Sequence, residues 1–359
     1  MALNKATIQT ISLPHICIPF FLIYDTSTIG ISIQIFRKLF KGGILKLDII
    51  SYSELLKQNK SSSVKMIEAA LLNKGIIGVN NIPHFDIKSK QYIKAAREFS
   101  DLDQTIKQQY TPNRDIGDTE GYELGAEWFK NNNGDWQIDD KKASYYAFVP
   151  NHHRNKWPSE IDFKTPYLEL GELIFNTGKM LLNVIGLNES LGLIHDDLIG
   201  YGRMLHYQKE NNVANTNLNW CGAHTDHGIF TGLIPAYYFQ NGNEIDEPDE
   251  AGLYIVPSNK HDFEKVYVPD KSTLLFQVGE FGQIISNDRV KATKHLVKKA
   301  KNEIERYTFA VFFSPHQDMT IRSKSTLNKD PRYIKNQTPD GFISYKNWET
   351  ASYEQYRVR

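Results

Sequence analysis

The chain of 359 residues is long enough for one large domain, or two smaller ones, with a sizeable core. Its 42 basic and 42 acidic side chains give a formal charge of zero, so the composition offers no support for a nucleic acid as a partner. Only two cysteines occur, Cys17 and Cys221, which excludes a disulfide framework and favours a reducing, cytoplasmic location.

Residues 1–46 form an N-terminal extension with no recognisable role. Residues 16–36 are mostly apolar, but Asp25 and a run of hydroxyl residues interrupt them. A membrane-spanning helix needs about 20 apolar residues with few charges. A secretory signal needs a small-residue cleavage site after the apolar run, and none follows here. We therefore expect neither a membrane span nor a cleaved signal in this extension.

Alternating strand and helix patterns predict an N-terminal α/β region over residues 47–195. Leu47–Ile50 and Ile76–Val79 are short apolar runs typical of buried strands. Residues 86–110 carry apolar side chains at helical spacing and predict one long amphipathic helix. A second long helix is predicted over residues 166–186, beginning at a proline and ending at a glycine.

Short alternating stretches separated by Gly, Pro, Asn and Asp predict a β-rich catalytic core over residues 196–321. Many short strands with such turns are typical of an antiparallel sandwich or an open barrel, so we expect a mainly β fold with flanking helices. Residues 322–359 are polar with scattered aromatic residues and are predicted to pack on this core as a C-terminal segment. Residues 47–359 are therefore expected to form one compact unit.

A candidate metal site begins with His224 and Asp226, which are separated by one residue. Alternate side chains of a strand point to one face, so both could reach the same ion. His295 is the candidate for a third ligand. Two imidazoles and one carboxylate suit non-haem Fe(II) and leave positions for small ligands. Alone, a His-x-Asp pair also arises by chance, and an isolated histidine is more often a surface or hydrogen-bonded residue.

A second polar feature lies in the predicted strand that follows His295. There Arg306 and Thr308 share one face with apolar residues, and burying an arginine and a hydroxyl is costly unless they meet an anion. A guanidinium beside a hydroxyl is a good receptor for a carboxylate. A tight hairpin through Ala300-Lys301 is predicted to set Arg306 roughly opposite His295 on the neighbouring strand.

Three separated motifs together resemble the iron(II)- and 2-oxoglutarate-dependent oxygenase family, specifically its isopenicillin N synthase-like branch: His224-x-Asp226, His295 and Arg306-x-Thr308. The similarity extends over most of the chain. It implies a double-stranded β-helix, or jelly-roll barrel, with the metal ligands inside its open mouth.

The resemblance also implies the chemistry. A ferrous oxygenase would use O₂ to hydroxylate, desaturate or cyclise a small organic substrate, with the two histidines and the aspartate as iron ligands. The co-substrate 2-oxoglutarate would bind the iron through its keto acid end and would leave as succinate and CO₂. Its far carboxylate would pair with Arg306 and Thr308, assisted by Tyr207. Ascorbate is a further candidate, as a reductant.

Three residues are candidates for contacts to the primary substrate. Tyr122 and Glu127 lie in segments similar to a family segment near the substrate, and Phe313 lies in the strand that carries Arg306. For Tyr122 and Glu127, a side chain that merely covers the core is at least an equal alternative.

Three other functions stay open at this point. An oxidase of the same fold could take its electrons from its substrate or from ascorbate instead of 2-oxoglutarate. A zinc hydrolase could use the same ligands, although no glutamate lies in an obvious general-base motif beside them. The third is a non-catalytic binding protein with a retired site. In every case we expect a monomer that binds a small molecule and neither nucleic acid nor membrane.

Overall fold

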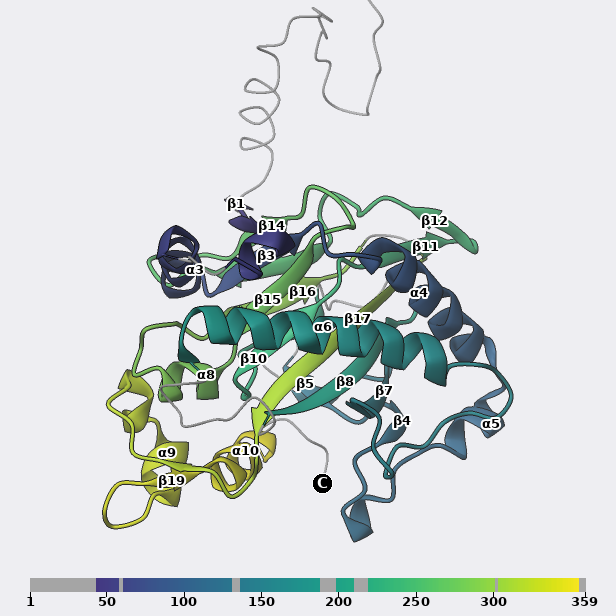
Figure 1. The fold of residues 1–359 in the computed structure, drawn as a ribbon. Helices are drawn as coiled ribbons and strands as arrows, with labels where there is room; N and C mark the ends of the chain where they lie inside the picture. Colours follow the sequence, from purple (N-terminus) through teal and green to yellow (C-terminus); the bar gives the residue numbers. More distant parts are fainter. Residues whose placement is uncertain are drawn as a thin grey trace, which may run out of the picture. The chain divides into compact units, whose positions relative to one another are not determined.

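The computed structural model describes residues 43–57, 61–130, 136–187, 198–209, 219–300 and 303–354. The predictions for residues 1–42 therefore lie outside the described residues. Two β-sheets carry most of the strands in the described part (Figure 1). The prediction of a mainly β fold with flanking helices is confirmed.

The larger sheet has ten strands, and its pairs are antiparallel except for the parallel pair β2–β3. Its spatial order is β2 (Ile49–Ser51), β3 (Ile76–Asn80), β15 (Leu274–Val278), β10 (Phe230–Leu233), β17 (Ile304–Pro315), β8 (Leu198–Tyr207), β7 (Lys142–Val149) and β4 (Gly121–Leu124). Two further strands branch from β17, namely β11 (Tyr237–Gln240) and, beyond it, β12 (Asn243–Ile245).

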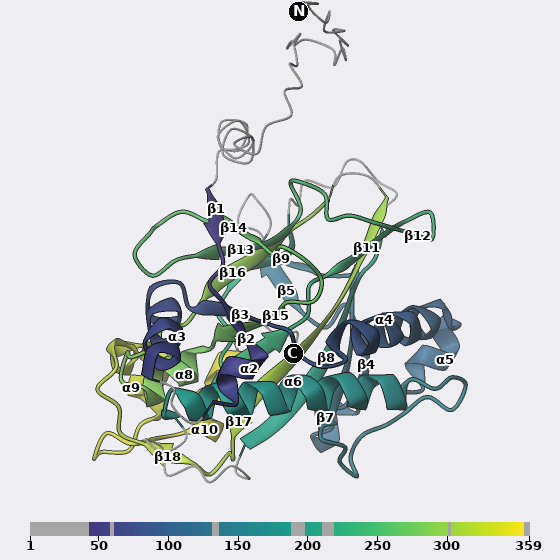
Figure 2. The same cartoon turned by 45° about the horizontal axis from the view of Figure 1, so that its top comes forward.

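The smaller sheet has five strands, which lie side by side in Figure 2. Their order is β1 (Ile44–Lys46), β14 (Glu264–Tyr267), β13 (Gly252–Val256), β16 (Lys294–Lys298) and β9 (Asn219–His224). Two small two-stranded sheets complete the described strands: β5 (Trp128–Lys130) with β6 (Trp136–Ile138), and β18 (Thr320–Ile321) with β19 (Ile343–Ser344).

Helices flank the sheets and also form most of the C-terminal segment (Figure 1). The α-helices are α2 (Tyr52–Leu55), α3 (Ser61–Asn73), α4 (Phe85–Asp101), α5 (Gln104–Gln108), α6 (Lys164–Val184), α8 (Glu280–Ile285), α9 (Pro331–Asn336) and α10 (Tyr345–Tyr353), with 3-10 turns η1 (Arg114–Ile116) and η2 (Thr326–Lys329). Within the described part of the chain, no helix combines the length and the apolar character needed to cross a membrane.

Helix α6 closes the outer face of the larger sheet, crossing β10, β17 and β7 (Figures 1 and 2). Its apolar stripe includes Leu170, Ile174 and Leu181, all fully buried and spaced at helical intervals. Gly178 lies on the same face, where a Cβ atom would be 2.2 Å from the ring of Phe313. The helix therefore lies unusually close to β17, and the second predicted long helix is confirmed.

The first predicted long helix, over residues 86–110, is two helices instead of one. Helix α4 ends at Asp101, Leu102 is extended, and α5 begins at Gln104. The side chain of Asp103 accepts a hydrogen bond from the backbone N–H of Thr105, which is the geometry of an N-cap. This cap begins a new helix, which explains why the amphipathic stretch forms two helices and not one continuous helix.

The strand predicted over Leu47–Ile50 is also divided. β1 ends at Lys46 in the smaller sheet, and β2 begins at Ile49 in the larger one. The two residues between them carry the chain from one sheet to the other. Asp48 is fixed there by Lys74, whose Nζ lies 2.7 Å from its carboxylate.

The predicted hairpin between His295 and Arg306 is wrong. β16 pairs with β9 and β13 in the smaller sheet, whereas β17 pairs with β8, β10 and β11 in the larger sheet. The chain therefore changes sheets between residues 298 and 304, so His295 and Arg306 are not cross-strand neighbours. The short distance in sequence between the two strands suggested a hairpin. In the structure the chain instead passes from the smaller sheet to the larger one between these strands.

Replacing Gly178 with alanine should destabilise the protein, although alanine has the higher helix propensity. The added Cβ would meet the buried rings of Phe313 at 2.2 Å and Phe276 at 2.9 Å. Overpacking of this kind costs about 1–3 kcal/mol, which denaturant unfolding would measure. Asn176→Ala, at an exposed position of the same helix, is the matched control and should change stability by less than about 0.5 kcal/mol. Unchanged or increased stability of Gly178→Ala would contradict the close packing.

Candidate functional site

Two histidines and one aspartate converge where β9 pairs with β16. His224, the last residue of β9, pairs in register with His295, and their ring centroids are 4.2 Å apart. Oδ1 of Asp226 lies 3.7 Å from Nε2 of His224 and 4.0 Å from Nε2 of His295. The three side chains each offer a ligand atom within 4.8 Å of the others, which is close enough to hold one metal ion.

Asp226 joins this group from a loop, not from the strand face that the sequence predicted. β9 ends at His224, and the backbone carbonyl of Asp226 accepts a hydrogen bond from the N–H of Glu280 at 2.7 Å. The Thr231 hydroxyl donates to Oδ2 of Asp226 at 2.5 Å. These two bonds hold the carboxylate toward the imidazoles and leave Oδ1 for a metal.

The second ring nitrogen of each histidine faces a backbone carbonyl. Nδ1 of His224 lies 2.8 Å from the carbonyl oxygen of Gly222, and Nδ1 of His295 lies 2.9 Å from that of Thr293. A carbonyl oxygen only accepts, so each Nδ1 carries a proton, and in the neutral form of either ring the lone pair for a metal ion is on Nε2.

Burial and charge set the protonation of these three groups. Burial lowers the pKa of His295 to about 4, and the neighbouring His224 adds to the effect. Burial alone would raise the pKa of Asp226, but the two imidazoles and Thr231 outweigh it and hold the pKa below its ordinary value. Burial likewise opposes charge on His224, yet Cys221 and Asp226 outweigh it and raise the pKa to about 9. A metal ion therefore competes with a proton at His224 but not at His295.

The chemistry of the donor set fits Fe(II). Two imidazoles and one carboxylate on one side of the ion leave positions for exogenous ligands, although the same donors also suit zinc. Two other histidines close in sequence point elsewhere. Nε2 of His227 lies 3.7 Å from the carboxylate of Glu349, and His206 stacks on Tyr307 with centroids 4.1 Å apart.

The ligand loop, residues 225–229, is anchored by side chains from α8 and the C-terminal segment. The Thr225 hydroxyl donates to Oε1 of Glu280 at 2.5 Å, and Arg332 binds the same carboxylate through two N–H groups at 2.8 and 3.0 Å. The indole of Trp348 donates to the backbone carbonyl of His227 at 3.1 Å. These anchors were not predicted, because they lie far from the loop in sequence and belong to no motif.

Arg306 forms a buried cationic site on the larger sheet. Its guanidinium carbon lies 5.1 Å from the ring centroid of Tyr207 and 5.9 Å from that of Tyr238, the residues with which it pairs in register. Nε donates to the Tyr238 hydroxyl at 3.3 Å, but Nη1 is buried with no hydrogen-bond partner. Among the described residues, no carboxylate lies within 4.0 Å of the guanidinium. A buried cation in this state is costly unless an anion binds it.

The other two predicted members of the carboxylate receptor lie near Arg306, but they differ in availability. Thr308 is on the same strand, two residues along, and its hydroxyl donates to the carbonyl of Ile234 at 2.9 Å. It can donate to a carboxylate only after turning away from that carbonyl. Tyr207 is buried, and burial raises its pKa, so its phenol stays protonated and able to donate.

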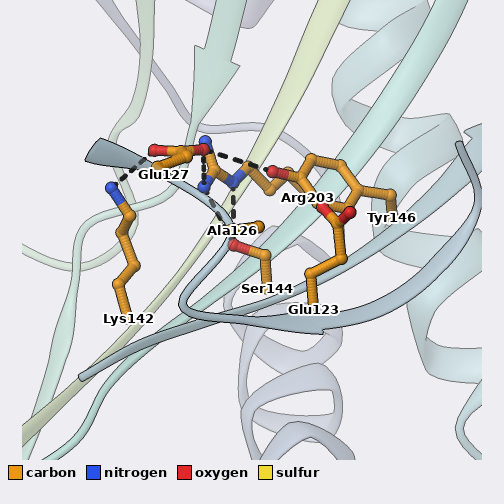
Figure 3. Close-up of a pocket in the computed structure, with 7 residues that line it drawn as sticks. All are labelled: Glu123, Ala126, Glu127, Lys142, Ser144, Tyr146 and Arg203. Atoms are coloured by element: carbon orange, nitrogen blue, oxygen red, sulfur yellow. Dashed lines mark hydrogen bonds and ion pairs between the residues drawn. The ribbon is translucent and has the colours of Figure 1, made fainter. Parts of the chain in front are cut away.

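A polar pocket (Figure 3) is connected to the metal-ligand group through Lys142 and Cys221. Glu127 bridges two cations there, with 2.7 Å to Nζ of Lys142 and 2.6 Å to Nη2 of Arg203. Nζ of Lys142 lies 4.0 Å from Sγ of Cys221, which in turn lies 3.8 Å from Nδ1 of His224. The rest of the lining is also mainly polar: Glu123, Ala126, Ser144 and Tyr146.

The remaining two candidates for substrate contacts lie in the hydrophobic core. Tyr122 is 2% exposed and meets Phe99 edge-on with ring centroids 5.7 Å apart. Phe313 is fully buried and stacks on Phe175 of α6 at 5.1 Å. Core packing accounts for both side chains, and neither lines the polar pocket. Of the three candidates, only Glu127 does.

Residues 203–315, which contain the three candidate metal ligands and Arg306, match the sequence model of the 2OG-Fe(II) oxygenase superfamily. No curated protein sequence matched the chain. The isopenicillin N synthase-like branch stays a prediction.

Several solved structures have a similar fold. A 2OG-Fe(II) oxygenase family protein from Caulobacter crescentus aligns over 86% of this chain and 98% of its own, with a TM-score of 0.65 and 21% identity. Full-length T7H from Neurospora crassa, solved with α-ketoglutarate and thymine, aligns over 88% and 98%, with a TM-score of 0.61 and 18% identity. JOX2, in complex with 2OG, Fe and JA, aligns over 86% and 85%, with a TM-score of 0.63 and 18% identity. These likenesses support the predicted jelly-roll fold.

His224→Ala should abolish tight binding of a divalent metal, because it removes one of three donor atoms. Calorimetric titration with Co(II) should show an affinity loss larger than the roughly 10- to 100-fold that follows removal of an outer-shell partner. His227→Ala is the matched control, since that imidazole faces Glu349 and should leave Co(II) affinity nearly unchanged. Equal losses in the two variants would contradict the assignment of ligands.

Proposed function

We propose, from the premise that residues 203–315 form a 2OG-Fe(II) oxygenase superfamily domain, that the protein is an Fe(II)- and 2-oxoglutarate-dependent oxygenase. It oxidises a small organic substrate with O₂ and releases succinate and CO₂. The observation that carries the proposal is the convergence of donor atoms from His224, Asp226 and His295 within 4.8 Å. Such a donor set would hold a metal ion through three protein atoms and would leave coordination positions for exogenous ligands.

Bound Fe(II) and 2-oxoglutarate supply the oxidising chemistry, and the chain supplies position and environment. Two carbonyl-bound imidazoles and a carboxylate held by Thr231 present three fixed donor atoms. Fixing them before the metal binds lowers the cost of assembling the site. The Thr225–Glu280 hydrogen bond fixes the residue between His224 and Asp226 and so maintains their spacing.

Arg306 supports 2-oxoglutarate as the co-substrate. Its Nη1, which has no hydrogen-bond partner, is a charged donor available to a carboxylate. The planar guanidinium also suits bidentate pairing with a carboxylate. The rings of Tyr207 and Tyr238 exclude water from this position, which strengthens the ion pair by lowering the local dielectric constant. A same-fold oxidase without 2-oxoglutarate would leave this buried cation without an anion.

The polar side chains near the metal-ligand group favour a polar primary substrate over an apolar one. Glu127, Lys142 and Arg203 line the polar pocket, and hydrogen-bonding side chains of this kind fix the orientation of a polar molecule. T7H and JOX2 were solved with thymine and JA, respectively, which are small organic molecules. We assign Glu127 the role of a substrate-facing residue, because its carboxylate lies between the two cations of the pocket.

The test of the function is Fe(II)-dependent conversion of 2-oxoglutarate to succinate. We expect slow succinate formation in the presence of Fe(II), ascorbate and O₂, and faster formation when a correct polar substrate is added. Succinate is quantified by mass spectrometry, with His295→Ala as the inactive control. Activity with Zn²⁺ and none with Fe²⁺ would support a hydrolase. Substrate oxidation without 2-oxoglutarate would support an oxidase of the same fold.

Arg306→Met should weaken 2-oxoglutarate binding by roughly 10- to 100-fold, the value of a charge-assisted hydrogen bond of about 1.5–3 kcal/mol. The variant should remain folded, because it removes a buried cation that has no ion-pair partner among the described residues. Affinity is measured by calorimetry on the Zn²⁺-loaded protein. Arg97→Met, which alters an arginine lying over Phe239 instead, is the matched control. Unchanged 2-oxoglutarate affinity in Arg306→Met would refute the role of Arg306.

A further inference from the structure

Trp220 places a second unsatisfied donor close to Arg306. Its side chain is 4% exposed, and its indole Nε1 is buried without a hydrogen-bond partner in the described part of the chain. Buried indole N–H groups ordinarily have a partner, since leaving one unpaired costs free energy. We infer that Trp220 donates its indole N–H to the far carboxylate of 2-oxoglutarate, alongside Arg306. This inference rests on the proposed function.

The contacts of Trp220 bring it to the aromatic cage around Arg306. Its ring centroid lies 5.7 Å from that of Tyr207 and 6.1 Å from that of Tyr238. The same two rings flank the guanidinium of Arg306 at 5.1 and 5.9 Å. One cage, made by Tyr207, Trp220 and Tyr238, therefore adjoins two unsatisfied buried donors, Nη1 of Arg306 and Nε1 of Trp220.

An irregularity of β9 explains how Trp220 turns toward the cage. Cys221 pairs with Val297, and Asn219 pairs with Lys298. Between these two pairs the chain moves by two residues along β9 but by only one along β16. Trp220 lies between the two paired positions and has no partner of its own. A bulge of this kind re-aims a side chain that regular alternation would direct elsewhere. Both Trp220 and Cys221 consequently contact the same apolar cluster between the sheets.

The position of Trp220 along β9 also suits the length of the co-substrate. Trp220 precedes the candidate ligand His224 by four residues, a separation of at most about 13 Å along a strand. If the keto acid end of a five-carbon diacid were held at the metal, an indole at this distance along the same strand could reach its far carboxylate. The smaller sheet would thus contribute to both ends of the molecule, the ligand at one end and the indole at the other.

The role predicted for Trp220 is selectivity among 2-oxo acids. An indole N–H is a donor only, so it pairs with a carboxylate but gives nothing to a methyl group at the same place. A 2-oxo acid with an apolar tail would leave both Nε1 of Trp220 and Nη1 of Arg306 unpaired. Sites that contain such polar groups reject analogues lacking the matching group far better than apolar pockets do.

Trp220→Phe tests this role because it removes the N–H and keeps an aromatic ring. The Zn²⁺-loaded protein is titrated by calorimetry with 2-oxoglutarate and with 2-oxovalerate, which has the same chain length but no far carboxylate. We expect about tenfold weaker binding of 2-oxoglutarate and no change for 2-oxovalerate. Trp157→Phe is the matched control, since that indole donates to Asn151 near the surface, and it should change neither affinity.

The outcomes separate the inference from the proposed function. If the wild-type protein binds no 2-oxoglutarate, the proposed function fails. If it binds 2-oxoglutarate and Trp220→Phe binds it equally well, only the role of Trp220 fails. Should the variant not fold, the wild-type protein labelled with ¹⁵N at its five indole nitrogens decides the question. One indole N–H resonance should shift markedly with 2-oxoglutarate and not with 2-oxovalerate; no such shift would overturn the inference.

Discussion

The antiparallel pairing of β9 with β16 is the constraint on which the candidate site depends. It sets His224 opposite His295, and the two imidazoles can face one ion only in that register. A slip of one residue would turn one ring to the other face of the sheet. The neighbouring strand β13 holds β16 in place from its other side, so the register belongs to the whole smaller sheet and not to one strand pair.

The larger sheet separates two environments on its two faces. Toward α6 the side chains are apolar and tightly packed, as Phe309 and Phe313 illustrate. On the other face β8 and β17 carry Arg203 and Arg306, which are charged and largely buried. Arg203 is paired with Glu127, but Arg306 has no ion-pair partner among the described residues. An unpaired buried charge costs stability, so the position of Arg306 is better explained by binding than by folding. Tyr122 and Phe313 lie among the apolar side chains, whereas Glu127 lies among the charged ones.

The sequence was sufficient where local pattern and donor chemistry decide the outcome. The alternating strands, the helix α6 and the choice of three residues whose donor atoms converge could all be predicted from the sequence. The sequence was insufficient where long-range topology decides. In a sequence, a short polar turn looks the same whether it joins two strands of a hairpin or two strands of different sheets. The change of sheet between His295 and Arg306 could therefore not be predicted. Trp220 was missed because a strand bulge, which has no clear sequence pattern, directs its side chain.

The anchoring of the ligand loop by Arg332 and Trp348 has a consequence for biosynthesis. Both side chains come from a part of the chain that leaves the ribosome after both candidate metal ligands His224 and His295. A nascent chain already carries every donor atom while the loop between His224 and Gly228 still lacks these restraints. The ligand loop can therefore reach its final arrangement only after residue 348 has emerged from the ribosome. A metal ion that binds before then binds to donor atoms that are less ordered.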